Sequence, residues 1–297
     1  RLALIGLGRW GTNIKNTLEA IGGVEVVTFE KDASPLTPVV AKKKGIQAVI
    51  VATPGSTHAE VALPFVKEGL PVFIEKPMTT SLKDALKLQE AAQQSGSNVF
   101  VGHLHMYNPA YLAAKELVPH VGDTRYAMFE GMNWGPFRED MSAWWDWAPH
   151  DISMALDLFE KPSSIQAWGD YNWAVARLLF APPYEGGDAR GGGSFSATIH
   201  VTTLSAEKRK RVTVAGTKYS VVFDDTAERK IAVHEQGNVT YPNYGKDMPL
   251  TAELKAFLEM VETGKPPKTD IKNGVEVVRI LDAGEKSMKL EGKKVNL

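Results

Sequence analysis

Two pairs of side chains in this sequence have the types and spacing that chemistry requires. Glu75 and Lys76 come just after the apolar run "LPVF" and are stopped by Pro77, so they stand at the end of a predicted strand. Charges there either meet solvent or belong to the reactive edge of a site. Asp146 and His150 form the second pair, spaced D-x-x-x-H. Histidine suits general base work near neutral pH, and a lysine ammonium stabilises negative charge that develops on oxygen. Such groups suit proton transfer to or from an oxygen atom and the stabilisation of charge on it.

The relation between Asp146 and His150 depends on where their helix begins. If the helix runs through both residues, they share one face at i and i+4. Pro149 favours a helix that begins there, which would leave Asp146 in the preceding loop. His150 could instead be a helix-start residue without a chemical role. We interpret Asp151 as an acid at the helix start, where the helix dipole favours negative charge.

A glycine motif near the amino end predicts a dinucleotide site. The run "IGLGRWGTN" places Gly6, Gly8 and Gly11 in the pattern G-x-G-x-x-G, between a predicted strand and a predicted helix. The first glycine permits a tight turn, the second lets a pyrophosphate approach the backbone, and the third allows close packing of helix on strand. Backbone amides at the helix start then attract the phosphates. Arg9 and Trp10 lie within the same loop and are also predicted to contact the cofactor.

Further cofactor contacts are expected at the ends of the next strands. Glu30 closes the second predicted strand, where an acid binds the ribose hydroxyls and disfavours a 2′-phosphate, so NAD is expected rather than NADP. The adjacent Lys31 could accommodate that phosphate, which keeps NADP open, and Glu30 could also be a plain exposed acid. Thr53 and Pro54 end the third strand, where ligands of such sheets bind.

The segment "STH" that follows leaves simpler interpretations open. His58 is included among the cofactor contacts, although a residue at the start of a helix is the simpler interpretation of it. Ser56 or Thr57 could cap that helix. Glu75 is also expected to bind the cofactor or to steer Lys76.

Composition limits the class of protein. The chain has 297 residues, 43% hydrophobic and 23% charged, with a net charge of −1 and no cysteine. These values are typical of a globular protein, exclude disulfides and thiolate sites, and give no case for nucleic acid as a partner. No apolar run approaches the roughly 18 residues that span a bilayer, so no membrane partner is expected. The absence of cysteine fits a cytoplasmic location.

The order of predicted elements indicates two domains. Strands alternate with helices up to about Val121, which predicts a Rossmann domain, a doubly wound parallel sheet, over residues 1–121. Strands then follow one another, which predicts a mostly antiparallel open sheet with helices on one face, an α+β domain, over residues 122–297. The glycine-rich run "YEGGDARGGGS" predicts a mobile hairpin loop. Between Glu30 and Ala48 there is room for only one helix, so either this unit is shortened or residues are missing near Lys44–Ile46.

Other candidate groups have plainer interpretations. His103 and His105 would share a strand face, but no third ligand is evident, so no metal site is expected. Tyr107 could reach the site, but a packed aromatic residue is the simpler interpretation of it. The tryptophans of "WWDWAP" could line a sugar pocket or pack in the core.

The motifs together carry a family resemblance. "GLGRWG", "AVIVATPGSTHAEVAL", "VFIEKPMTTSLKDA" and "DWAPHDI", in this order, resemble the Gfo/Idh/MocA family, named for glucose–fructose oxidoreductase and inositol dehydrogenase. The late run "GKPPKTDIKNGVEVVRILDAGEKS" is similar to the closing segment of that family. The resemblance therefore covers nearly the whole chain.

The resemblance implies an NAD(P)-dependent oxidoreductase that acts on CH–OH groups. It implies that Lys76 touches both the nicotinamide ribose and the reacting oxygen, that His150 is the catalytic histidine and that Asp146 is its acidic partner. In this family the open sheet commonly forms subunit contacts, so a homo-oligomer of two or four chains is expected. The Lys76–Pro77 peptide could be cis, which would help to aim Lys76 at the nicotinamide.

The substrate is the least determined feature. The chain has Met106 near a position where family members often carry arginine, and "MSAWW" replaces a glycine-rich segment. "GRWGTNI" and "KRKRVTVAGTKYSVVFDD" are most similar to the branch that acts on nucleotide-linked sugars. We therefore expect a sugar or nucleotide sugar as substrate. There are two alternatives. One is an inositol or other polyol dehydrogenase, and the other is a non-catalytic regulator that binds NAD(P) or a sugar.

Overall fold

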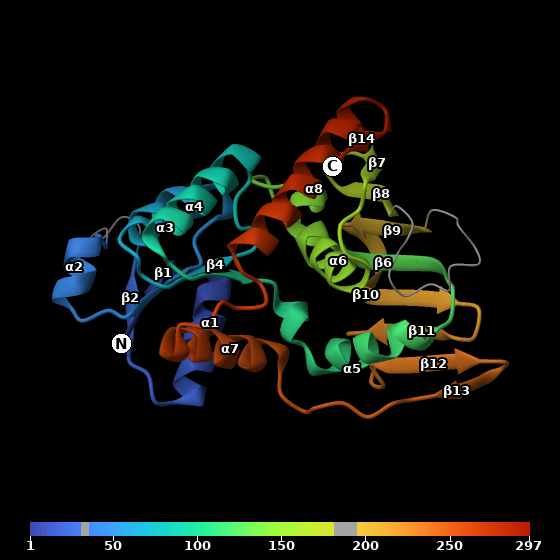
Figure 1. The fold of residues 1–297 in the computed structure, drawn as a ribbon, viewed down its shortest axis with the longest axis horizontal. Coiled ribbons are helices and arrows are strands. Elements are labelled where there is room, and N and C mark those ends of the chain that lie inside the picture. Colours follow the sequence, from blue (N-terminus) through green and yellow to red (C-terminus); the bar gives the residue numbers. More distant parts are fainter. Residues whose placement is uncertain (31–35, 181–194) are drawn as a thin grey trace. The chain divides into compact units, whose positions relative to one another are not determined.

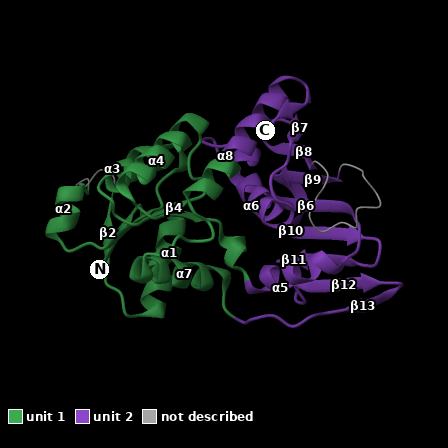
Figure 2. Cartoon of the chain, in the orientation of Figure 1, with its two compact units in different colours: residues 1–108, 247–278 green, residues 109–246, 279–297 purple. Residues whose placement is uncertain are grey.

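The computed structural model describes residues 1–30, 36–180 and 195–297. Lys31 and the glycine-rich run predicted as a hairpin loop lie outside these residues. Two compact units are present, one made of residues 1–108 and 247–278 and the other of residues 109–246 and 279–297 (Figures 1 and 2). Each unit thus combines two separate stretches of the chain. The division into domains at residue 121 stays a prediction.

The first unit is built on a parallel sheet with the strand order β2-β1-β3-β4-β5. The strands are short, and those other than β2 are buried along their whole length, as expected for a sheet covered on both faces. Their bounds are β1 Leu2–Ile5, β2 Val26–Phe29, β3 Ala48–Val51, β4 Val72–Glu75 and β5 Val99–Gly102. Every neighbouring pair runs parallel. The predicted doubly wound sheet is confirmed.

Helices cover both faces of this sheet. Helices α3 (His58–Lys67) and α4 (Leu82–Ser95) pack on one face, and α1 (Arg9–Ile21) and α7 (Pro249–Thr263) pack on the other (Figure 1). The predicted ends of α4 are confirmed, since the Ser81 hydroxyl accepts a hydrogen bond from the Asp84 amide and Gly96 follows with a φ of 71°.

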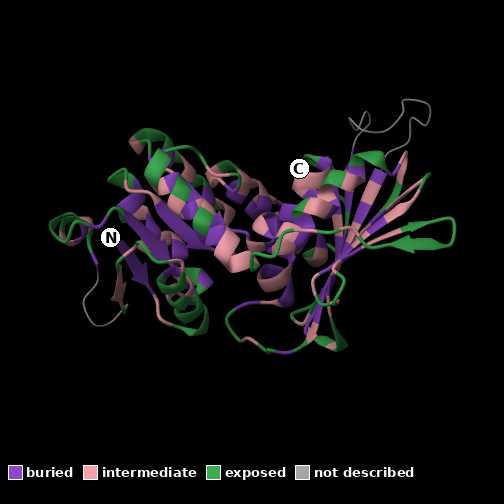
Figure 3. Cartoon of the chain, turned by 90° about the horizontal axis from the view of Figure 1, so that it is seen from below, coloured by how far each residue is buried: buried purple, intermediate pink, exposed green. Residues whose placement is uncertain are grey.

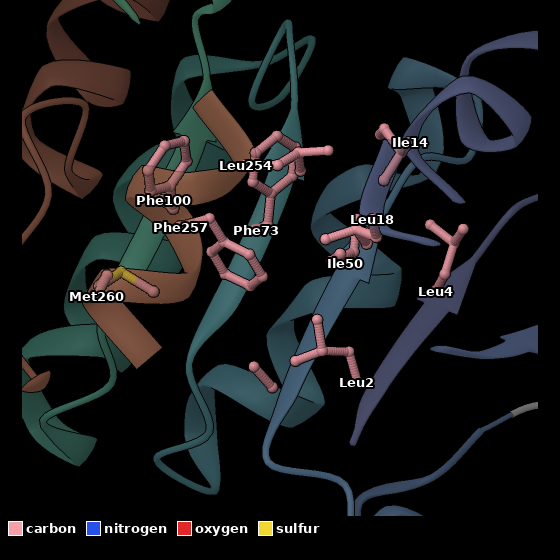
Figure 4. Close-up of a cluster of buried hydrophobic side chains, with 11 residues drawn as sticks. Leu2, Leu4, Ile14, Leu18, Ile50, Phe73, Phe100, Leu254, Phe257 and Met260 are labelled. Atoms are coloured by element: carbon pink, nitrogen blue, oxygen red, sulfur yellow. The ribbon is translucent and has the colours of Figure 1, made fainter. Parts of the chain in front are cut away.

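The core under α1 and α7 joins distant parts of the sequence. Figure 4 shows apolar side chains of the two helices and four strands in contact, including Leu18, Phe73, Phe100 and Phe257. The rings of Phe73 and Phe100 stack with their centroids 5.1 Å apart, and Phe257 meets both edge-on. Such aromatic pairs stabilise a core by about 1 kcal/mol each beyond their burial. The late helix α7 is therefore an integral part of the first unit.

One short helix stands in the gap noted between Glu30 and Ala48. Helix α2 (Pro38–Lys43) begins after Thr37, whose hydroxyl accepts a hydrogen bond from the Val40 amide. The chain then turns directly into β3. The described residues here hold one helix and no strand.

The second unit is built on a nine-stranded sheet with the order β13-β12-β11-β10-β6-β9-β8-β7-β14. All neighbours are antiparallel except β6 and β9, which run parallel. The bounds are β6 Thr124–Trp134, β7 Ser164–Gly169, β8 Trp173–Phe180, β9 Phe195–Thr202, β10 Leu204–Gly216, β11 Ser220–Asp224, β12 Ile231–Glu235, β13 Asn238–Thr240 and β14 Val295–Asn296. The mostly antiparallel sheet predicted for this part of the chain is confirmed.

Helices α5 (Pro109–Leu117) and α6 (Ala143–Phe159) pack on one face of this sheet. The residues that face them form a buried row that crosses seven strands in register: Ala167, Ala176, Ile199, Phe129, Val212, Phe223 and Ile231. Figure 3 shows the resulting alternation of buried and less buried positions along these strands. The last long helix, α8 (Ile271–Lys289), begins in the first unit and ends in the second.

Helix α6 begins earlier than the proline suggested. It starts at Ala143, so Asp146 and His150 both lie on it and Pro149 stands inside it. Trp144 and Trp145 secure its first turn, because their indole N–H groups donate to Leu281 O (2.9 Å) and Glu285 Oε2 (3.0 Å). A helix start at Pro149 was therefore wrong, and so was the interpretation of Asp151 as a residue of the helix start.

Among the described residues, no helix has the length and apolarity needed to cross a bilayer.

Candidate functional site

The glycine loop after β1 has the geometry of a dinucleotide-binding turn. Gly6 has a φ of +96°, and a Cβ atom there would lie 2.7 Å from the Ala52 oxygen. A Cβ on Gly11 would lie 2.0 Å from the Gly6 oxygen, so helix α1 packs directly on the turn. A Cβ on Gly8 would meet nothing within 4 Å, which leaves the backbone there open to a ligand. These are the three different roles that the motif predicted.

The amino end of α1 is open in the same place. Gly8 is its N-cap and provides no side-chain cap, so the first amides of the helix can bind an anion. Arg9 and Trp10 are the first helical residues and are both exposed. The pyrophosphate of a dinucleotide fits this arrangement of amides and positive charge.

The other predicted cofactor residues share the edge at which these parallel strands end. Glu30 follows β2 and is exposed, and Thr53 and Pro54 follow β3. The Thr57 hydroxyl bonds to the Thr53 hydroxyl and to the Pro54 oxygen, both at 2.8 Å, so it closes this turn. Thr57 is the N-cap residue of α3, one of the two positions that the sequence left open, but its side chain makes no cap bond to the helix.

Glu75 and Lys76 occupy this edge at the end of β4. The Lys76–Pro77 peptide is cis, as hypothesised. Glu75 is 6% exposed, and its carboxylate accepts the indole N–H of Trp10 at 2.5 Å and the backbone N–H of Lys76 at 3.1 Å. Burial raises the pKa of Glu75 to about 7, although Trp10 and Lys76 act in the opposite direction.

His58 holds two loops of this edge together. It is 1% exposed, and its ring nitrogens lie 2.8 Å from the Pro77 oxygen and 2.8 Å from the Thr53 oxygen. A neutral imidazole carries one N–H, so it donates to one carbonyl oxygen, whereas the charged form donates to both. Burial nevertheless lowers its pKa. His58 therefore positions the turns that carry Thr53 and Pro77, and its contact with a cofactor stays a prediction.

Two further histidines and a tyrosine lie near the end of β5. His103 is 1% exposed, and burial and the charge of Lys76 lower its pKa to about 3, so it is neutral at ordinary pH. His105 is also buried. Tyr107 stacks on Phe100 with centroids 5.1 Å apart, and its hydroxyl lies 3.0 Å from Thr269 Oγ1. Its interpretation as a packed aromatic residue is confirmed.

The second unit places the other catalytic candidates on α6. Asp146 and His150 are partly buried and stand one helical turn apart. Arg138 lies beside this turn, with its guanidinium 3.5 Å from Asp146 Oδ1 and in tighter contact with Asp140 (2.7 Å). These two acids raise the pKa of Arg138.

A small depression, about large enough for one water molecule, adjoins Asp146 within this unit. Its polar lining combines one cation with acid, amide and hydroxyl groups, from Arg138, Asp146, Tyr171, Asn172 and Thr203. Groups of this kind bind hydroxyl-rich ligands. Trp144 and Trp145 are 0% and 8% exposed and belong to the core, so of the three tryptophans in this segment only Trp147 could still line a sugar site.

Asp151 is fully buried and forms an ion pair with Lys210 of β10 at 2.7 Å. Burial raises the pKa of Asp151, while the charge of Lys210 lowers it. Gly131 leaves room for the pair, since a Cβ there would lie 3.0 Å from Asp151 Oδ2. Asp151 therefore fixes the helix that carries His150.

Sequence reasoning missed three of these charged residues. Glu253 of α7 is 0% exposed, and both of its carboxylate oxygens lack a hydrogen-bond partner among the described residues. Burial and the nearby Glu75 raise its pKa well above the usual value. Arg138 and Lys210 stand in ordinary polar runs. An acid inside the apolar run of "LTAELKAFLEMV" was the available signal for Glu253.

Over the described residues, no group of three or more acidic or histidine side chains could hold a metal ion.

Comparison with known proteins agrees with this geometry. Residues 23–103 match the GFO_IDH_MocA model, an oxidoreductase family with an NAD-binding Rossmann fold. The chain is 30% identical over 135 residues to scyllo-inositol 2-dehydrogenase (NAD(+)) of Bacillus subtilis. That match covers 40% of this chain and 40% of the relative.

Solved structures are similar over nearly the whole chain. An oxidoreductase from Magnetospirillum magnetotacticum is 30% identical with a TM-score of 0.81, covering 95% of this chain and 98% of that one. A UDP-N-acetylglucosamine 3-dehydrogenase from Acidithiobacillus ferrooxidans shares the fold at 21% identity and a TM-score of 0.82, covering 98% of both chains. The chain belongs to the Gfo/Idh/MocA family of NAD-binding oxidoreductases.

Proposed function

We propose that this protein is an NAD-dependent dehydrogenase that oxidises a ring hydroxyl of a sugar or polyol, or catalyses the reverse reduction. The observation that carries the proposal is the shared edge of the parallel sheet. There the open amino end of α1 lies next to the ends of β3 and β4, where Thr53, Glu75 and Lys76 are found. Ligands of doubly wound sheets bind at this edge.

The glycine loop suits a dinucleotide. Gly8 and the first amides of α1 would hold the pyrophosphate, and Glu30 would bind the ribose hydroxyls of the adenosine half. Because Glu30 is exposed at the end of β2, its carboxylate disfavours a 2′-phosphate, so NAD is the proposed cofactor over NADP. When bound, NAD supplies the hydride acceptor.

His150, Lys76 and Asp146 carry the proposed chemistry. His150 takes the hydroxyl proton of the substrate as the C–H bond breaks. The ammonium of Lys76 stabilises the alkoxide character of the reacting oxygen. Asp146, one turn before His150 on α6, orients the imidazole or binds a neighbouring hydroxyl. Removal of the proton and stabilisation of the oxygen thus come from separate residues.

The substrate is proposed to be rich in hydroxyl groups. The acid, amide and hydroxyl groups that line the depression beside Asp146 can form hydrogen bonds with the hydroxyl groups of a sugar or an inositol ring. The names of the relatives favour both a nucleotide sugar and a polyol. A regulator that binds NAD or a sugar without turnover stays the alternative from another class. We also propose a homo-oligomer and a cytoplasmic location.

The test combines two substitutions with a substrate panel. We expect Lys76→Met and His150→Gln each to reduce kcat by about 10²- to 10⁴-fold, since each removes one catalytic group. NAD affinity, measured by calorimetry, should change little in His150→Gln. The panel compares inositols, free sugars and nucleotide sugars by absorbance of NADH. Near-normal turnover in both variants would contradict the assigned roles, and tight NAD binding with no turnover on any compound would favour the regulator.

A further inference from the structure

One hydrogen bond connects the glycine loop to the strand that carries Lys76. Trp10 stands in the first turn of α1, and its indole N–H donates to Glu75 Oε1 at 2.5 Å. Glu75 is the last residue of β4 and precedes Lys76 directly. The Lys76 amide donates to the other carboxylate oxygen at 3.1 Å. A single carboxylate thus holds both the start of α1 and the strand end.

This carboxylate is buried, so its charge is costly. Glu75 is 6% exposed and faces Gly102 on β5, where an added Cβ would lie 3.2 Å from the carboxyl carbon. Burial raises the pKa of Glu75 to about 7, while the bond from Trp10 and the charge of Lys76 lower it. Glu75 therefore changes its charge near neutral pH, unlike an exposed glutamate.

The neighbouring histidines do not titrate in the same range. Burial lowers the pKa of His103 to about 3 and also lowers that of His58, so both rings are neutral there. Burial, and after it the nearby Glu75, raise the pKa of Glu253 well above its usual value. Tyr107, which lies near Glu253 and Asp270, has its pKa raised above the usual value.

We propose that Trp10 is a positioning residue whose bond to Glu75 links dinucleotide binding to pH. The bond is strong when Glu75 is ionised, because a charged acceptor binds an N–H donor roughly twice as tightly as a neutral one. It then fixes the first turn of α1, whose amides receive the pyrophosphate. When Glu75 takes up a proton, the bond weakens and the turn is less ordered before the ligand arrives. This inference rests on the proposed binding of NAD.

The direction of the pH effect follows from these states. Affinity for the dinucleotide is highest above the pKa of Glu75, where the carboxylate is ionised, and falls as the pH drops through about 7. The difference between a charged and a neutral acceptor corresponds to about a three- to tenfold change in Kd.

The test measures ligand affinity rather than turnover. Calorimetry gives the Kd of ADP-ribose and of NAD from about pH 5.5 to about pH 8.5, a range that brackets neutrality. ADP-ribose has the pyrophosphate but lacks the charged nicotinamide ring, so its affinity reports the loop and not attraction between that ring and Glu75. We expect the wild-type protein to bind both ligands more weakly at acid pH, with the same midpoint near 7.

Three variants separate the possible causes. Trp10→Phe keeps an aromatic ring but removes the N–H donor, and Glu75→Gln keeps an acceptor that is always neutral. Both should bind ADP-ribose with the affinity of the acidic wild type at every pH, and the double variant should be no weaker than either single one. Glu253→Gln removes the other buried carboxyl and should still show weaker binding at acid pH, because the bond between Trp10 and Glu75 remains.

Each contrary result has a definite meaning. A pH dependence that persists in Trp10→Phe, or that disappears in Glu253→Gln, would overturn the inference. So would an effect seen with NAD and not with ADP-ribose, since that would show direct attraction to the nicotinamide ring. If neither ligand binds at any pH, the proposed function itself fails, whereas binding that is tight and independent of pH refutes the inference alone.

Discussion

At the scale of single residues, the pair Lys210–Asp151 shows how an ion pair outside the proposed chemistry can support it. Asp151 is adjacent to His150 and has no exposure, and Lys210 is 7% exposed. Their atoms meet at 2.7 Å across the interface between α6 and β10. Two desolvated charges gain little net stability together, but removal of one leaves the other uncompensated. The pair therefore specifies how α6 sits on the sheet.

We expect Lys210→Met to lower the free energy of unfolding by about 3–5 kcal/mol, because Asp151 would be left buried and charged. The double variant Asp151→Leu/Lys210→Met should recover most of this loss, since it removes both charges. Urea unfolding gives the values. Arg125→Ala is the matched control, as its ion pair with Asp123 has side-chain exposures of 64% and 34% and should contribute little. A stable Lys210→Met protein would mean that Asp151 already carries a proton.

At the scale of elements, the turn from β1 into α1 offers a comparison within one motif. Gly11→Ala would place a Cβ 2.0 Å from the Gly6 oxygen, which is backbone and cannot move without displacing α1. Gly8→Ala would meet no atom within 4 Å. The two substitutions add the same methyl group and differ only in what surrounds it.

We expect Gly11→Ala to lower the melting temperature markedly, because the helix must move away from the strand. Gly8→Ala should keep nearly the wild-type melting temperature but weaken NAD by about tenfold or more, since the methyl group would occupy the approach of the pyrophosphate. Thermal unfolding and calorimetry on both variants check this. Equal NAD affinity in Gly8→Ala and the wild type would show that the phosphate binds elsewhere.

Most elements could be predicted from local pattern, and the exceptions have physical causes. The parallel sheet of the first unit could be predicted because strands alternate with helices there and the helix ends are clear. Ser81 and Gly96 around α4 are an example. The start of α6 could not be predicted, because Pro149 suggests a start whereas the bonds of Trp144 and Trp145 to α8 decide it. Likewise, no local signal places α7 against α1.

The candidate site could be predicted less completely than the fold. The glycine loop and Lys76 follow from short motifs whose residues are close in sequence. The bond between Trp10 and Glu75 joins residues 65 positions apart, and the burial of Glu253 depends on the packing of α7. Such interactions arise only when the chain is folded. The raised pKa values of Glu75 and Glu253 therefore could not be predicted from the sequence.

At the scale of the whole molecule, the nine-stranded sheet has two unlike faces. The face under α5 and α6 carries the buried apolar row, while the opposite face carries Met128, Thr198 and Arg177 in register. Tyr126 of β6 and Trp168 of the neighbouring strand β7 are 42% and 43% exposed. A broad sheet face with apolar and polar side chains mixed is typical of a protein–protein interface. We therefore propose that this face joins two copies of the chain.

We expect the protein to have a mass in solution that is two or four times 32.5 kDa, measured by light scattering during gel filtration. Thr198→Lys should reduce the mass to that of one chain, because it adds a cation beside Arg177 at the centre of the proposed interface. Gln93→Lys makes the same change at an exposed position of α4 in the other unit and should leave the mass unchanged. Unfolding by urea would show whether Thr198→Lys is still folded. A folded variant that keeps the full mass would place the subunit contact on a different surface. A wild-type protein with the mass of a single chain would contradict the proposal that this face joins two copies.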